Sequence, residues 1–276
     1  MLRGTILYAS DMYYNLKESE LRHIERIEES FMRTVLQTSK GCPIVQLYLE
    51  LGQIPARFEI QKMRCLYLKY ILQEDENSLL KRVFELQLKD KSRGDWASTV
   101  LEDLKELQIT QSFEVIKEMS SEMYSKLLKE KIKENALKYL TNKQKSKGKE
   151  IIYSEIQMAE YLQTSSPLTI NQKKGMFALK NRMIEISENF PGKNMESECH
   201  CGNEESILHI YNCDLLNQGN LSNIKYENIF NGDIKDQVKV LNKFEENWKM
   251  REYLNSEKKM PCDPLVDPLF VMSSNG

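Results

Sequence analysis

Three thiols and one imidazole gather in a short stretch of the chain, supplied by Cys199, Cys201, His209 and Cys213. Structural zinc sites bind about four such ligands in a tetrahedron. His209 and Cys213 are four residues apart, so on a helix they share one face, and Gly202 follows the first cysteine pair, where a tight turn must present both thiolates. The pattern predicts a structural Zn²⁺ site with two ligands from a loop and two from a helix.

The spacing of the first pair leaves alternatives open. Only His200 separates Cys199 from Cys201, whereas two residues usually intervene in the first cysteine pair of such a site. The short gap limits how far apart the two thiolates can lie around one metal ion. His200 can replace one of them as a ligand. The remaining alternative is three reduced cysteines and a surface histidine that bind no metal.

Positive charge is concentrated in the middle of the chain, although the net charge is only -2. Residues 126–149 contain nine lysines against Glu130 and Glu134. This distribution favours contacts with RNA or DNA phosphates in the middle of the chain. The alternative is a helix face that lysines with glutamate partners merely solvate. The predicted phosphate-binding residues are Lys143, Lys145, Lys147, Lys149, Lys173, Lys174, Lys180 and Arg182.

The cellular setting is predicted from what the sequence lacks. No window reaches the roughly 18 to 20 apolar residues of a membrane span, and the apolar residues at the start are too few for a signal-peptide core. We therefore expect an intracellular protein, in the nucleus or cytoplasm, with no membrane partner. The six cysteines are then expected to be reduced thiols or metal ligands rather than disulfides.

Long helices must position these residues, because Gly and Pro are scarce and Lys, Glu and Leu abundant. The fold class is predicted as mostly α: a helical segment, then a small zinc-knuckle region and a C-terminal helix. The helix over 55–73 is apolar on most faces and is expected to be central. Apolar periodicity and capping residues predict helices over 16–37, 43–52, 55–73, 78–86, 96–107, 112–140, 154–162, 171–186 and 233–254.

The domain organisation follows from breaks in this pattern. Residues 1–140 are predicted to form a helical region, and residues 141–153, which begin with the polar run 141–149, a basic linker. Residues 154–257 hold a helix and the zinc-knuckle region. The proline-rich tail 258–276 is predicted to be disordered.

Several segments resemble the C-terminal part of non-LTR (LINE-like) retrotransposon reverse transcriptases. Around the cysteine cluster, the matching runs are 177–183, 189–193 (Asn-Phe-Pro-Gly-Lys) and 199–213, which are similar to the helix, turn and zinc knuckle of that family. The knuckle departs from the family pattern in its shortened first pair and in Ile210 after His209. Further segments look like the region after the polymerase thumb or the region after the knuckle, namely 6–11, 26–36, 47–55, 226–230 and 248–252.

The resemblance implies a fragment that binds nucleic acid without a catalytic centre. A polymerase needs paired carboxylates for its metals, and no Tyr-x-Asp-Asp sequence exists here. Glu102-Asp103 is interpreted as part of a solvated helix face. We therefore predict no enzyme activity, with RNA or DNA as partner. The missing polymerase core or another protein chain is a further possible partner, and residues 1–140 are expected to expose an apolar patch where that core would dock.

Two alternatives to this function stand beside it. One is a helical protein-interaction module, or a decayed scaffold, that binds no nucleic acid. The other is one piece of an active polymerase that contributes binding without chemistry.

Overall fold

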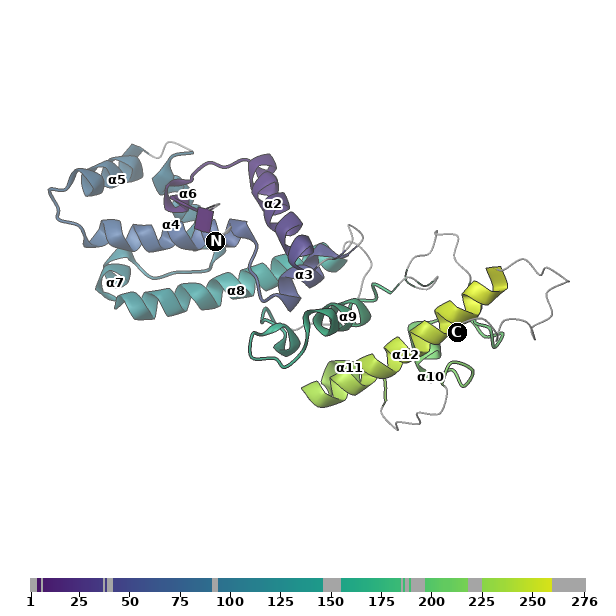
Figure 1. Ribbon diagram of the computed structural model, residues 1–276. Helices are drawn as coiled ribbons and strands as arrows, with labels where there is room; N and C mark the ends of the chain where they lie inside the picture. The colour runs from purple at the N-terminus through teal and green to yellow at the C-terminus, as the bar shows by residue number, and fades with distance from the viewer. Residues whose placement is uncertain are drawn as a thin grey trace, which may run out of the picture. The chain divides into compact units, whose positions relative to one another are not determined.

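The computed structural model describes residues 4–5, 7–36, 38, 42–90, 94–145, 155–184, 186, 189, 197–217 and 225–259 (Figure 1). These residues are mostly helical, as predicted, and the β-structure among them is limited to two isolated bridges. The chain divides into two compact units, Met1–Ser166 and Pro167–Gly276. Within the described residues, no helix has both the length and the apolar composition that crossing a bilayer requires.

The first unit is a bundle of α-helices with two short 3-10 turns. Its elements are η1 (Ser10–Met12), α2 (Glu18–Leu36), α3 (Ile44–Glu50), α4 (Ala56–Gln73), α5 (Leu79–Asp90), α6 (Trp96–Glu106), α7 (Phe113–Glu118), α8 (Ser121–Lys145) and η2 (Glu160–Leu162).

Helix α4 is the centre of this unit, as the sequence predicted, because it contacts η1, α2, α5, α6, α7 and α8. Helix α8 packs its inner face against α4. Every fourth residue of that face is fully buried: Tyr124, Leu128, Ile132, Ala136 and Leu140. Spacing by four keeps these side chains on one side of the helix.

Helix α2 buries carboxylates as well as apolar side chains, and it leaves three apolar side chains exposed. Glu28 is buried and accepts hydrogen bonds from the Tyr48 hydroxyl at 3.3 Å and the Ala56 backbone N–H at 3.0 Å. It thereby caps the first turn of α4, where Pro55 offers no side-chain cap. Ile27, Phe31 and Val35 are exposed. They form an apolar row along α2, and the expected docking surface for a polymerase core stays a prediction.

The stretch 112–140, predicted as one helix, is two helices separated at Met119 and Ser120. Met119 has an extended backbone, and the Ser120 hydroxyl accepts from the Met123 N–H to cap α8. The ammonium of Lys69 on α4 donates to the carbonyls of Ile116, at 2.8 Å, and Met119, at 2.5 Å. These contacts satisfy carbonyls that the end of α7 leaves free.

The predicted linker, the predicted tail and the helix predicted over 154–162 differ from the structure or lie partly outside the described residues. Helix α8 continues to Lys145, and the predicted linker beyond it, 146–153, lies outside the described residues, as does the predicted tail from 260 onward. The expected helix over 154–162 is limited to η2. Before it, Met158 pairs with Leu51, and the Ala159 N–H donates to the Glu50 carbonyl, so this segment packs on the first unit.

The second unit is organised around its last helix. Its elements are α9 (Ile170–Lys180), α10 (Ile207–Asn212), α11 (Asn228–Asn231) and α12 (Ile234–Lys259), and α12 contacts each of the other three. Thr169 and Gln172 form a capping box at the start of α9. The helix predicted over 171–186 ends at Lys180, because Arg182 adopts a left-handed backbone with φ 53° that α-helix cannot continue.

Candidate metal centre

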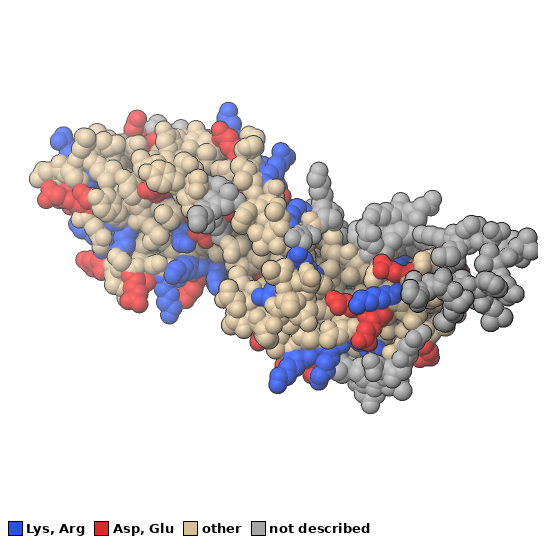
Figure 2. Space-filling model, in the orientation of Figure 1, with Lys and Arg blue, Asp and Glu red and all other residues tan. Residues whose placement is uncertain are grey.

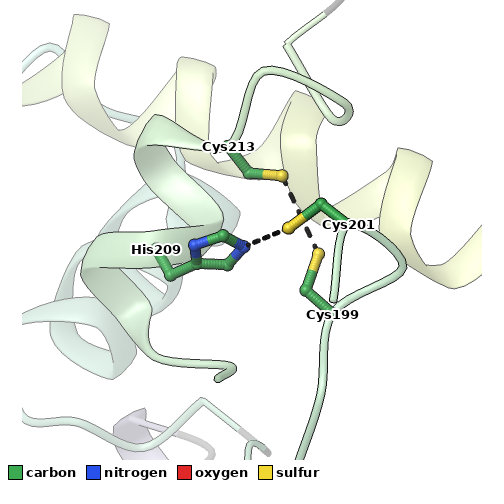
Figure 3. A group of neighbouring side chains, drawn as sticks. All are labelled: Cys199, Cys201, His209 and Cys213. Atoms are coloured by element: carbon green, nitrogen blue, oxygen red, sulfur yellow. Dashed lines mark hydrogen bonds between the residues drawn. The ribbon is translucent and has the colours of Figure 1, made fainter. Parts of the chain in front are cut away.

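The four predicted ligands come together in the second unit. The Sγ atoms of Cys199, Cys201 and Cys213 and a ring nitrogen of His209 all lie within 4.8 Å of one another. Cys199 Sγ is 3.8 Å from Cys213 Sγ, and Cys201 Sγ is 3.2 Å from His209 Nε2 (Figure 3). This Cys₃His group can hold a metal ion. The surrounding residues 197–213 are called the Cys/His segment below.

A tight turn presents the first two cysteines. Glu198 and Glu204 form an antiparallel bridge, and the Cys199 N–H donates to the Asn203 carbonyl at 2.9 Å. Gly202 closes the turn with φ +85°, a backbone conformation that side-chain-bearing residues rarely adopt. The glycine that the sequence pattern singled out is therefore required by the backbone of the turn.

A short helix presents the other two ligands. The Ser206 hydroxyl accepts from the His209 N–H at 3.0 Å and starts α10. His209 lies within α10, and Cys213 is its C-cap residue with an extended backbone. The two ligands four residues apart therefore lie on one side of α10, as the spacing predicted.

His200 is directed away from the group. Its Nε2 lies 2.7 Å from Oδ1 of Asn255 on α12. The alternative in which His200 replaces a cysteine is therefore not the arrangement that the structure contains. Cys199 and Cys201 lie together although only one residue separates them. The side chain of that residue, His200, is hydrogen-bonded to α12.

The thiols of the group differ in burial and in acidity. Cys199 is 5% exposed, and burial raises its pKa to about 11. Hydrogen bonds from Asn203 lower the pKa of the exposed Cys201 to about 6, the amide Nδ2 lying 3.2 Å from its Sγ. Cys199, Cys201 and Cys213 are all free thiols in the structure. Cys201 is the thiol of the group that solvent reaches most easily.

Sequence reasoning missed three polar residues that hold the Cys/His segment in place. Asn247 and Asn255 on α12 contact residues next to the ligands, and Arg251 contacts Glu205, four residues from the nearest ligand on either side. Their spacing of four residues was the available signal, because it puts them on one face of the last helix. Nothing in the local sequence tells which segment that face contacts.

The predicted phosphate-binding residues of the second unit differ in exposure. Arg182 is exposed, and Lys173 and Lys174 at the start of α9 are half-buried. Lys180 is only 7% exposed, so it is not presented on the surface beside the Cys/His segment. These residues therefore do not form one exposed basic cluster.

The predicted phosphate-binding residues of the first unit also differ in exposure. Lys145 is exposed at the end of α8. Lys143 is half-buried 3.8 Å from a Glu29 carboxylate oxygen, and burial lowers its pKa. Lys147 and Lys149 lie outside the described residues.

Helix α8 exposes Lys138 and, at positions i, i+3 and i+7, three further lysines. Lys126, Lys129 and Lys133 are exposed, and none forms an ion pair with a side chain that the structure describes. On the face shown in Figure 2, basic and acidic side chains are interspersed, with no large area of one sign. Over this face, binding of phosphate would therefore rely on local groups of lysines.

The carboxylates of Glu102 and Asp103 do not both face solvent. Asp103 is buried, and Arg64 donates to both of its carboxylate oxygens at 2.6 and 2.8 Å. Burial raises the pKa of Asp103. The interpretation of this carboxylate as solvated was wrong, because its position on α6 faces α4 rather than water.

Comparison with known proteins found no matching family model, no matching curated protein and no matching solved structure. The resemblance to retrotransposon reverse transcriptases therefore stays a prediction from the quoted segments.

Proposed function

We propose that this chain is a non-catalytic nucleic-acid-binding protein whose Cys/His segment is ordered by a structural Zn²⁺ ion. The observation that carries the proposal is the spacing of the Cys₃His group. A tetrahedral zinc ion with Zn–S bonds of about 2.3 Å separates two sulfur ligands by about 3.8 Å. Cys199 Sγ and Cys213 Sγ are 3.8 Å apart.

The composition of the group supports a structural rather than a catalytic ion. Catalytic zinc keeps one position for water or substrate, whereas structural zinc is closed by about four protein ligands. Four protein ligands are present here. Zinc bound to them would cross-link the turn that bears Cys199 and Cys201 to α10, and would supply folding free energy to a segment with few apolar side chains.

Binding of nucleic acid is supported by two features. The first is the set of exposed lysines on α8, Lys126, Lys129 and Lys133, together with Lys145 and Arg182. The second is the resemblance to the C-terminal part of retrotransposon reverse transcriptases, in which this region grips nucleic acid. Contacts between lysines and phosphates release counterions, so the expected binding is weak and falls steeply as salt rises.

A titration with labelled single-stranded RNA tests this function. Anisotropy is measured at two salt concentrations for the native chain and for Lys126→Gln/Lys129→Gln/Lys133→Gln. The matched control replaces three ion-paired lysines, Lys62, Lys81 and Lys131, and so removes the same charge. The α8 variant should lower the slope of log K against log salt by about 2, because each lost phosphate contact removes about 0.7.

Two outcomes contradict the proposed binding. One is an equal loss of affinity in the α8 variant and the control, which would show a response to net charge alone. The other is no binding by the native chain at low salt.

A protein-interaction module is the second candidate function. The observation in its favour is the exposed apolar row Ile27, Phe31 and Val35 on α2. An apolar helix face of this kind suits a protein partner better than a phosphate backbone. A native chain that fails to bind RNA or DNA, but whose binding to a co-purifying protein is abolished by Phe31→Asp, would favour this candidate.

A further inference from the structure

Three polar side chains follow one another along a single face of α12. Asn247 Nδ2 donates to the carbonyls of Ile210, at 2.8 Å, and Tyr211, at 3.2 Å. Arg251 donates to both carboxylate oxygens of Glu205, with Nη2 2.7 Å from Oε2. Asn255 Oδ1 lies 2.7 Å from His200 Nε2. Together these contacts span the whole Cys/His segment.

Two of these contacts fall beside a ligand of the metal group in the sequence, and the third lies midway between two ligands. His200 lies between Cys199 and Cys201, and Ile210 directly follows His209. Glu205 lies at the junction of the turn and α10, before the cap residue Ser206. The turn and α10 are therefore tied to the same helix, which runs behind the group in Figure 3.

Of the three contacts, the one between Glu205 and Arg251 joins two buried charged side chains. Glu205 is 2% exposed and Arg251 is 8% exposed. A buried charge without its partner is strongly unfavourable, so each of these residues needs the other in place. The Arg251 guanidinium also lies over the Trp248 ring, 4.5 Å from its centroid, which holds it on the helix face.

We propose that Asn247, Arg251 and Asn255 are positioning residues for the metal site, and that metal binding and docking of α12 are coupled through them. This inference rests on the proposed zinc site. The three side chains hold the turn and α10 at ligand spacing before the ion arrives, which lowers the ordering cost of binding. By reciprocity, the bound ion stabilises the docking of α12 to the same extent.

Zinc affinity in the full chain tests the inference with no ligand altered. Chelator competition is measured for Arg251→Met, Glu205→Gln, the double variant and Asn255→Ala. The control is Lys249→Met, an exposed residue of the same helix. We expect Arg251→Met to bind zinc about 10- to 100-fold more weakly and Lys249→Met to match the native chain. The double variant should bind more tightly than either single variant, because it leaves no charge buried alone.

Hydrogen exchange supplies a readout that a purely structural contact would not move. Adding zinc should slow exchange of the α12 amides in the native chain and in Lys249→Met, and much less in Arg251→Met. If Arg251→Met does not fold, zinc binding by Asn255→Ala tests the inference instead. This variant removes only one half-buried contact, and it should still bind zinc more weakly than the native chain. Zinc binding by the native chain with equal affinity in all variants overturns this inference and leaves the zinc site standing. A native chain that binds no zinc overturns both.

Discussion

Cys199 and Cys213 are separated by 14 positions in the sequence, and their Sγ atoms lie 3.8 Å apart in the structure. A disulfide bond would place them about 2.05 Å apart. Both side chains are buried, one in the turn and one at the end of α10. The distance is that of two ligands on one tetrahedral metal ion, so the two elements are arranged around a common point.

Removal of metal should affect the second unit alone. The Cys/His segment and α12 are joined by hydrogen bonds that border the ligands, whereas the core of the first unit lies on α4, α6 and α8. We expect a chelator to speed hydrogen exchange in residues 197–213 and in α12. Amides of α4 and α8 should exchange at unchanged rates. Loss of protection throughout both units would contradict this separation.

Gly202 should be sensitive to substitution because of its backbone rather than its surroundings. Its φ is +85°, and a Cβ added there would meet no atom within 4 Å. Gly202→Ala should weaken metal binding by about 1 to 2 kcal/mol, the cost of the left-handed conformation. Gly202→Asn should weaken it less, since asparagine tolerates that conformation. Chelator competition measures both, and equal loss in the two variants would point to a steric cause instead.

The sequence predicted that these three cysteines and His209 lie together, because the geometry that brings them together is local. The spacing of His209 and Cys213, the turn at Gly202 and the cap at Ser206 all act within a few residues of the ligands. The contacts of Arg251 with Glu205 and of Asn255 with His200 join residues 46 and 55 positions apart. Contacts over such separations leave no periodic pattern at either end, so sequence reasoning did not find them.

The helices were likewise predicted correctly where residues close in the sequence determine the helix ends. The boundaries of α4 and the Asp95 cap of α6 follow directly from Pro55 and from the Asp95 side chain, which accepts from the Ser98 N–H. The break between α7 and α8 was missed although Ser120, which caps α8, is a local signal for it; the contacts of Lys69 with the end of α7 come from α4. The inward turn of Glu28 on α2 likewise depends on α4, whose first N–H groups need an acceptor.

Lys69 should therefore matter more for stability than other lysines of α4. Lys69→Met leaves the carbonyls of Ile116 and Met119 without this donor, at a cost of about 1 to 3 kcal/mol. Lys62→Met on the same helix removes only one part-buried ion pair with Glu59 and should cost less, about 1 kcal/mol or below. Urea unfolding of the first unit compares the two variants. Equal midpoints would contradict the role given to Lys69.

Acid should remove the small stabilising effect of Glu18. Hydrogen bonds from Arg57 lower the pKa of Glu18 below its usual 4.5. A carboxylate with a lowered pKa in the folded state stabilises above its usual pKa and loses this effect as pH falls through the lowered value. The native chain should be more stable than Glu18→Gln by at most about 1 kcal/mol at pH 7. Thermal unfolding at pH 7 and below pH 4 should show that difference shrinking, and a growing difference in acid would contradict the assignment.

Metal content of the purified chain tests the zinc site most directly. Elemental analysis should find about one Zn²⁺ per chain, lost in Cys199→Ser and Cys213→Ser and retained in Cys65→Ser, a buried cysteine of the first unit. Cobalt substituted for zinc should give the intense visible absorption of a tetrahedral thiolate site. Native protein that is isolated without metal, and whose Cys/His segment shows no change in hydrogen exchange when zinc is added, would contradict the account.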